Sequence, residues 1–160
     1  MSKSTPPIPP GLENIIPHLV CDPASEAIEF YKKAFGAEEM GRMPTPNGKL
    51  MHAAIRIGTS MVFLVDDFPE FRGGKSQSPQ ALKGTPVTLH RYVENVDAAI
   101  KRAQDAGATV FMPAQDMFWG DRYGIIVDPF GHQWSLATHI KDVTPAEMQA
   151  AMKNAGAPQK

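Results

Sequence analysis

The chain has 160 residues, a formal net charge of −1 and a single cysteine, Cys21. Lys plus Arg total 16 and Asp plus Glu total 17, so the charge gives no reason to expect nucleic acid or an acidic membrane surface as a partner. One cysteine excludes an internal disulfide, and no apolar run is long enough to cross a membrane. We therefore expect a soluble cytoplasmic protein with one domain, or two small units that share a core.

Residues 1–13, MSKSTPPIPPGLE, are rich in Pro and Ser and contain no apolar signal core, so we expect a flexible N-terminal arm. Residues 14–67 then show a short apolar strand, a helix and three strands. In the helix, AIEFYKKAFGA (27–37), apolar residues recur at helical spacing, and Gly36 is placed to end it. Asp22 or Ser25 is positioned to cap its first turn.

Three strand patterns complete this first module: EEMGRM, KLMHAAIRI and SMVFLVDD. On the middle strand, Ala53, Ile55 and Ile57 alternate toward the helix, which leaves His52 on the opposite face. The acidic pair Asp66–Asp67 at the end of the third strand is interpreted as a solvated edge. Residues 68–85 are too long and too rich in Gly, Ser and Pro for a simple connection, and they predict a lid or a linker.

Residues 86–139 repeat the same order of elements. The segment AIKRAQDAGA (99–108) matches the first helix, with Gly107 at its end and Asn95 or Asp97 as its cap, and strands TVFMPA, RYGIIVD and QWSLAT follow. One such module exposes an apolar sheet face and needs a second beside it. Residues 140–160 form a C-terminal helix and tail, with Thr144 as the cap and Pro145 in the first turn. The sequence therefore predicts an α+β fold of two βαβββ modules.

Two strings and the internal repeat identify a family resemblance. PHLVCDPASEAIEFYKKAFGAEE and DPFGHQWSLATHIKDVTPAEM resemble the opening and the closing segment of the PhnB-like branch of the vicinal oxygen chelate superfamily, which contains glyoxalase I, extradiol dioxygenases and bleomycin-resistance proteins. The resemblance covers roughly Ile15 to Met148. It implies a curved mixed sheet around a concave cavity, helices on the outer face, and a homodimer.

In metal-using members of this superfamily, each module supplies two ligands, one from its first strand and one from its last. The ligands are His, Gln or Glu. The resemblance places these positions at Ile15, Phe63, Thr88 and Ser135. Three of these residues cannot hold a divalent ion in the usual way, and Ser135 is a poor neutral ligand. We therefore expect no metal cofactor.

An alternative metal site remains open. His52, His90 and His139 would hold zinc or another divalent ion if they converged, although no local pair of histidines has metal-binding spacing.

Strand alternation selects the side chains that face the cavity. The candidate ligand-binding residues are His52, Phe63, Thr88, His90, Tyr92, Trp119, Tyr123 and Ser135. His52 and His90 are candidates for a general acid and base near neutral pH, or they hydrogen-bond within the sheet. His139 is assigned to hydrogen bonding at its strand end, and His18 is predicted to pack against the helix.

Three functional readings follow. The first is a protein that binds a small organic molecule without a metal, or a cofactor-free enzyme built on the same pocket. The second is a metal-dependent lyase or dioxygenase with non-standard ligands. The third is a structural module with a filled cavity. If the chain is an enzyme, the resemblance implies a lyase, isomerase or dioxygenase of the glyoxalase type.

Overall fold

The computed structural model describes residues 5–155, so residues 1–4 of the expected arm and 156–160 of the tail lie outside the described part. The chain divides into two compact units, Met1–Leu82 and Lys83–Lys160. Residues 5–17 contain no helix or strand, and most of their side chains are exposed. No helix in the described range has the length and apolar character that a membrane span requires.

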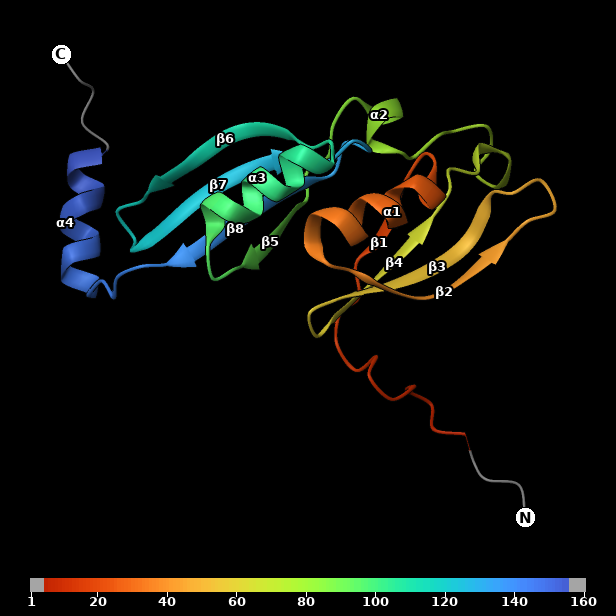
Figure 1. Ribbon diagram of the computed structural model, residues 1–160, viewed down its shortest axis with the longest axis horizontal. Coiled ribbons are helices and arrows are strands. Elements are labelled where there is room, and N and C mark those ends of the chain that lie inside the picture. Colours follow the sequence, from red (N-terminus) through yellow and green to blue (C-terminus); the bar gives the residue numbers. More distant parts are fainter. Residues whose placement is uncertain (1–4, 156–160) are drawn as a thin grey trace. The chain divides into compact units, whose positions relative to one another are not determined.

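The first unit holds a four-stranded mixed sheet with one long helix across one face (Figure 1). Its elements are β1 (His18–Val20), α1 (Ala24–Phe35), β2 (Glu38–Pro44), β3 (Leu50–Ile57), β4 (Ser60–Val65), the 3-10 turn η1 (Pro69–Phe71) and α2 (Pro79–Leu82). The strand order is β1-β4-β3-β2. Strand β1 runs parallel to β4, and the other two pairs are antiparallel.

The apolar stripe of α1 forms the core of this unit, as its spacing predicts. Ile28 and Tyr31 are fully buried, and Ala53 and Ile55 of β3 are buried as well. Burying each large side chain of this kind stabilises a fold by about 1.5–3 kcal/mol. Gly36 ends the helix in the left-handed conformation with φ of 66°, which confirms its predicted role.

The start of α1 corrects two expectations. Neither Asp22 nor Ser25 caps the helix; its N-cap residue is Pro23, which has no side-chain donor or acceptor to offer. Asp66, which is distant in the sequence, caps the helix, because its Oδ1 accepts a hydrogen bond from the amide of Ala24 at 2.9 Å. Its Oδ2 accepts a second hydrogen bond from the amide of Leu50 at 2.6 Å. Asp66 is therefore buried and structural, and the solvated edge predicted for it is wrong.

Asp67 corrects the same prediction. It is only 7% exposed, and its carboxylate accepts hydrogen bonds from the amides of Gln77 and Ser78. Asp67 thus ties the end of β4 to the segment that follows it, whereas Asp66 ties it to the starts of α1 and β3. An acidic pair at a strand end does not reveal from its own sequence which distant backbone amides will meet it.

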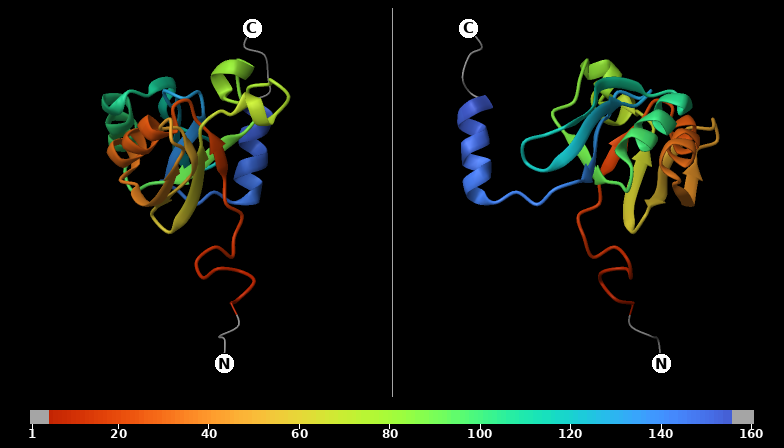
Figure 2. Two further views of the ribbon diagram at one scale, coloured as in Figure 1. Left: turned by 90° about the vertical axis from the view of Figure 1, so that its right-hand side faces the viewer. Right: turned by 60° about the vertical axis from the view of Figure 1, so that its left-hand side comes forward.

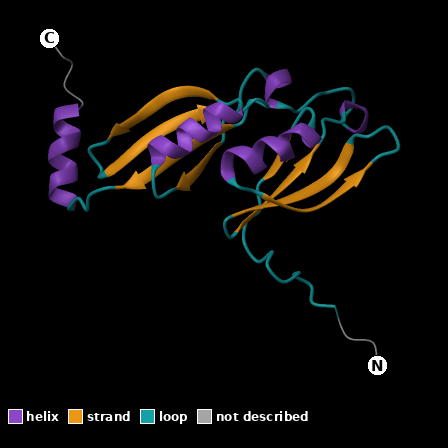
Figure 3. Cartoon of the chain, viewed as in Figure 1, coloured by secondary structure: helices purple, strands orange, loops and turns teal. Residues whose placement is uncertain are grey.

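The second unit repeats the arrangement (Figure 3). Its elements are β5 (Thr88–Tyr92), α3 (Val96–Ala106), β6 (Thr109–Asp116), β7 (Asp121–Val127), β8 (Gln133–His139) and α4 (Pro145–Ala155). The strand order is β5-β8-β7-β6, with β5 parallel to β8. Figure 2 shows α3 lying along one face of its own sheet. The predicted α+β class with two βαβββ modules is confirmed.

The local signals that end and cap helices of this unit act as the sequence predicts. Asn95 Oδ1 accepts a hydrogen bond from the amide of Ala98 at 2.9 Å, so Asn95 rather than Asp97 is the N-cap of α3. Gly107 ends α3 with φ of 120°. At the start of α4, Thr144 and Glu147 form a reciprocal capping box.

Candidate functional site

One face of the second sheet, opposite α3, collects the polar and aromatic side chains. Within β5, Thr88, His90 and Tyr92 are exposed, whereas the residues between them are partly buried toward the helix. The register places His90 beside Ser135 of β8. On the other side of β8, Tyr123 lies opposite Ala137, so strands β5, β8 and β7 carry one continuous row of side chains.

His90 and Ser135 are joined by a short side-chain hydrogen bond on this face. His90 Nδ1 lies 2.7 Å from Ser135 Oγ, and Ser135 is 2% exposed. Either atom is the donor, according to the tautomer of the ring. His90 Nε2 has no partner within the described residues, so it is the nitrogen that can exchange a hydrogen bond or a proton with a ligand.

Asp121 at the start of β7 organises the neighbouring side chains. It is 5% exposed, and its carboxylate accepts hydrogen bonds from Tyr92 Oη at 2.9 Å, Trp119 Nε1 at 3.1 Å and His139 Nδ1 at 2.8 Å. Burial acts to raise the pKa of Asp121, but the hydrogen bonds from His139, Tyr92 and Trp119 outweigh it and hold the pKa below its ordinary value. Asp121 is thus an ionised acceptor that fixes two aromatic side chains on the face.

His139 extends this network to the strand exit. Its second ring nitrogen, Nε2, lies 2.9 Å from Asp142 Oδ1. Hydrogen bonds to Asp142 and then to Asp121 raise the pKa of His139 above its ordinary value. Both nitrogens of this ring are engaged, so His139 has less capacity than His90 to bind a ligand.

Four aromatic rings pack against one another around this network. His90 meets Tyr92 edge to face at 4.8 Å and lies parallel to Tyr123 at 6.1 Å between ring centroids. Trp119 meets Tyr123 edge to face at 5.6 Å. Rings with a few fixed polar groups among them are typical of small-molecule sites.

Thr88 and Gln133 close the far end of the face. Gln133 Nε2 donates a hydrogen bond to Thr88 Oγ1 at 2.7 Å. Thr88 is exposed, and its hydroxyl hydrogen remains available as a donor. It is a peripheral member of the predicted set.

The first unit carries the remaining predicted site residues, His52 and Phe63. His18, which was predicted to face the helix, lies beside them. Leu19 is 7% exposed and packs on the helix side of β1, which puts His18 on the opposite face. The His18 ring lies 5.9 Å from that of Phe63 and 6.1 Å from that of His52. The expected packing of His18 against the helix is therefore wrong, because adjacent strand residues point to opposite faces.

The residues at the four expected metal positions do not fit the superfamily's ion. Ile15 and Phe63 have no donor atom, and Ile15 precedes β1 with 97% of its surface exposed. The hydroxyls of Thr88 and Ser135 already bond to Gln133 and His90. Between residues 5 and 155, no group of three or more His, Cys, Asp or Glu side chains is placed to hold a metal.

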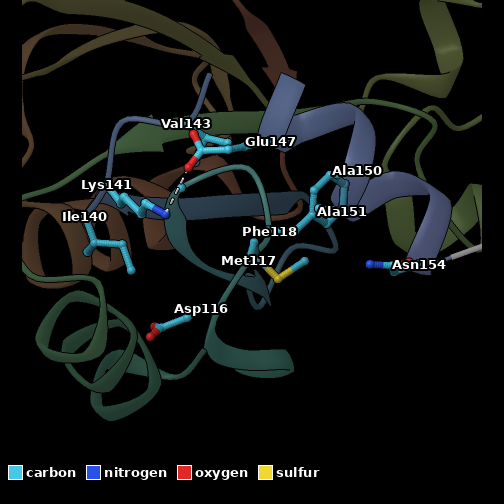
Figure 4. A pocket seen from close by; sticks show the side chains of 11 residues that line it. Asp116, Met117, Phe118, Ile140, Lys141, Val143, Glu147, Ala150, Ala151 and Asn154 are labelled. Carbon is cyan, nitrogen blue, oxygen red and sulfur yellow. Dashed lines mark ion pairs between the residues drawn. The ribbon is translucent and has the colours of Figure 1, made fainter. Parts of the chain in front are cut away.

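A pocket of about 580 Å³ lies elsewhere in the second unit, between α4 and the loop after β6 (Figure 4). Its apolar lining residues are Met117, Phe118, Ile140, Val143, Ala150 and Ala151. Lys141 Nζ and Glu147 Oε1 form an exposed ion pair at 3.8 Å within it. The pocket lacks hydrogen-bonding side chains fixed by buried partners, so we place the candidate site on the sheet face instead.

Comparison with known proteins identifies the family. Residues 15–136 match the model of the Glyoxalase/Bleomycin resistance protein/Dioxygenase superfamily. An uncharacterised protein of Mycobacterium tuberculosis is 55% identical over 140 residues, which cover 88% of this chain and 82% of that protein.

Two solved structures share the fold. The TioX structure from Micromonospora sp. ML1 is 25% identical, covers 80% of this chain and 99% of its own, and has a TM-score of 0.61. An Arabidopsis thaliana gene product is 26% identical, covers 78% of this chain and 97% of its own, and has a TM-score of 0.62. The chain therefore belongs to the Glyoxalase/Bleomycin resistance protein/Dioxygenase superfamily.

Proposed function

We propose that this chain binds a small organic molecule on the β5–β8–β7 face of its second unit, without a metal at the superfamily's usual positions. The observation that carries the proposal is the buried Asp121 carboxylate, which holds Tyr92 and Trp119 beside the His90–Ser135 pair. Groups fixed before a ligand arrives lose little conformational freedom on binding, and this favours affinity.

Each side chain has a distinct role in the proposed complex. His90 Nε2 makes the polar contact, because the other nitrogen of the ring is engaged by Ser135. Tyr123 and Trp119 offer ring surfaces to the body of the ligand. Asp121 is a positioning residue and does not touch the ligand, since its oxygens serve protein donors.

The chemistry of the donor set supports binding without a metal. Isoleucine and phenylalanine offer no lone pair, and a neutral hydroxyl is a weak ligand for a divalent ion compared with His, Asp or Glu. Any catalysis on this face would rest on His90 as a proton donor or acceptor.

We assign the chain to the PhnB-like branch within the superfamily. The strings PHLVCDPASEAIEFYKKAFGAEE and DPFGHQWSLATHIKDVTPAEM support this assignment. The first string encodes β1, α1 and the start of β2 in the first unit, and the second runs from the β7–β8 turn through β8 into α4 in the second unit.

A fragment screen read by NMR tests the proposal. The full chain, freed of metal with a chelator, is titrated with small aromatic and heteroaromatic compounds while the side-chain signals of His90, Trp119 and Tyr123 are followed. A saturable shift of these signals, lost in His90→Ala, is the expected result. His132→Ala, in the turn before β8, is the matched control and should retain binding.

Two results would overturn the proposal. One is a set of ligands whose shifts map elsewhere in the unit, for example to Met117 and Phe118 in the pocket beside α4. The other is binding that requires an added divalent ion, which would favour a metal-dependent lyase or dioxygenase.

A further inference from the structure

A neutral imidazole carries its one hydrogen on either ring nitrogen, and this choice decides whether His90 offers a donor or an acceptor to a ligand. We propose that Ser135 is a positioning residue whose hydroxyl donates to His90 Nδ1 and so keeps the ring hydrogen on Nε2. The site then selects neutral aromatic ligands that bring a hydrogen-bond acceptor. The ligand class rests on the proposed function and narrows it for the same site.

The burial of Ser135 decides which atom of the pair is the donor. Its side chain is 2% exposed, so water is not an alternative acceptor for the hydroxyl hydrogen. Among the residues that the structure describes, the Ser135 side chain makes a hydrogen bond to His90 Nδ1, at 2.7 Å, and to no other group. Buried donors without an acceptor are rare and costly in folded proteins. The hydroxyl therefore donates, and Nδ1 accepts through its lone pair.

The opposite tautomer would leave a buried hydrogen without a partner. If Nδ1 carried the ring hydrogen, it would point at Ser135 Oγ, and the hydroxyl hydrogen would have no acceptor. A loss of this kind shifts an equilibrium by about tenfold. Neighbouring rings hold the imidazole in place for this bond, since His90 meets Tyr92 edge to face at 4.8 Å and lies parallel to Tyr123 at 6.1 Å.

The other polar groups of the face also leave donors free. Tyr92 Oη and Trp119 Nε1 use their hydrogens on Asp121, whereas the oxygen of Thr88 already accepts a hydrogen bond and its hydroxyl hydrogen remains available. Thr88 lies two residues before His90 in β5, so both side chains are on the same face of the strand. A ligand with an acceptor satisfies these donors, and a ligand that has only donors leaves Nε2–H of His90 unpaired.

The charges near the site favour a neutral ligand. Asp121 is ionised at neutral pH, because hydrogen bonds hold its pKa below the ordinary value. When His139 is protonated, it lies between Asp121 and Asp142 at 2.8 and 2.9 Å, so this network has no surplus positive charge for an anion. An acidic ligand would meet a like charge, whereas a carbonyl oxygen or a ring nitrogen would not.

Nitrogen NMR of the full chain tests the tautomer without any ligand. Spectra are recorded at about pH 8.5, well above the ordinary titration range of imidazole. Long-range correlations through the ring protons distinguish a nitrogen that carries hydrogen from one that does not. Loss of signals in His90→Ala assigns this ring among the five histidines. The wild type should show hydrogen on Nε2 and a bare Nδ1.

Three variants test the role of Ser135. Ser135→Ala should convert the ring to a mixture of both tautomers, so its nitrogen shifts should move toward those of free histidine. Ser135→Thr retains the hydroxyl and should retain the wild-type tautomer. Ser78→Ala is the matched control, because Ser78 is also 2% exposed but lies in the first unit. It should leave the His90 spectrum unchanged.

Quinoline and indole test the consequence for ligands. Both are flat bicyclic molecules of similar size, but quinoline presents an accepting ring nitrogen and indole presents a donating N–H. The wild type should bind quinoline about tenfold more tightly than indole, since indole leaves Nε2–H unpaired. In Ser135→Ala this preference should fall to about threefold or less, because the ring can then turn a bare nitrogen to indole.

Hydrogen on Nδ1 in the wild type would overturn the proposal, and so would an unchanged His90 spectrum in Ser135→Ala. Indole that binds as tightly as quinoline, or a site that binds other fragments but not quinoline, would overturn the ligand class. Absence of any bound fragment on this face would instead refute the proposed function, and the ring spectrum would still decide the role of Ser135.

Discussion

Replacement of Asp121 by Ala tests whether one buried carboxylate holds the candidate site together. The variant deprives Tyr92, Trp119 and His139 of their shared acceptor. A hydrogen bond to a charged group contributes about 1.5–3 kcal/mol, but Tyr92 and His139 are exposed and can turn to water. We therefore expect a loss of about 2–3 kcal/mol in the free energy of unfolding, well below the sum of three such bonds.

Urea unfolding followed by circular dichroism measures this loss, and tryptophan fluorescence reports on the environment of Trp119. Asp121→Asn keeps the volume of the side chain and one accepting oxygen, so it should cost about 1–2 kcal/mol. Asp142→Asn is the matched control, because Asp142 is exposed and bonds only to the outer nitrogen of His139. A wild-type stability for Asp121→Ala, or a loss as large in Asp142→Asn, would refute the reasoning.

The pH dependence of the same variant checks the sign of the effect. The pKa of Asp121 lies below its ordinary 3.8 in the folded protein. A carboxylate with a lowered pKa stabilises the fold above its unfolded pKa and loses that contribution as the pH falls through the folded value. The difference between wild type and Asp121→Asn should therefore be full near pH 6 and shrink at acidic pH, below about 4.

Four further substitutions have defined outcomes. Gly124→Ala would place a Cβ 2.5 Å from Ile100 Cδ1 and should destabilise the chain by about 1–3 kcal/mol in urea, whereas Gly41→Ala, which meets nothing within 4 Å, should be nearly neutral. Asn95→Ala removes the cap of α3 and should cost about 1 kcal/mol by the same assay. His139→Gln should destabilise the fold below pH 6.5, where the protonated ring bonds to Asp142 and Asp121. The effect should shrink as the pH rises through the raised pKa of His139. Equal effects at pH 5.5 and pH 8.5 would contradict this.

The parts of the fold that depend on local chemistry could be predicted from the sequence. Helical spacing placed Ile28 and Tyr31 in the core, and the glycines at 36 and 107 end their helices as expected. The side-chain oxygen of Asn95 caps α3 by accepting a hydrogen bond from an amide only three residues further along the chain. Each of these interactions spans a few residues, so a pattern in the sequence is sufficient to indicate it.

The errors arise where a side chain acts over a long distance in the sequence. Asp66 caps a helix through an amide that lies 42 residues earlier in the chain. The residues next to Asp66 do not indicate this contact, so Asp66 was predicted to be solvated. Asp121 was not among the candidate site residues, because its three donors come from β5, the loop before β7 and the end of β8. Strand register is the only signal that brings them together, and register cannot be read from one strand.

His18 is a different kind of miss. Leu19 is apolar and buried, and alternation then puts His18 on the opposite face. Choosing Leu19 rather than His18 as the residue that faces the helix would have corrected the prediction. The contacts of His18 with His52 and Phe63 depend on the pairing of β1 with β4. The repeated order of elements in the two modules implies that these strands pair, but it does not give the register of the pairing.

The most direct test of the proposed function is the affinity of one bound fragment, measured by calorimetry in excess chelator and again with zinc added, for wild type and His90→Ala. Binding without a metal predicts the same dissociation constant within about twofold in both solutions, and a loss of about tenfold or more in His90→Ala. Binding that disappears in chelator and returns with one zinc ion per chain would contradict the account.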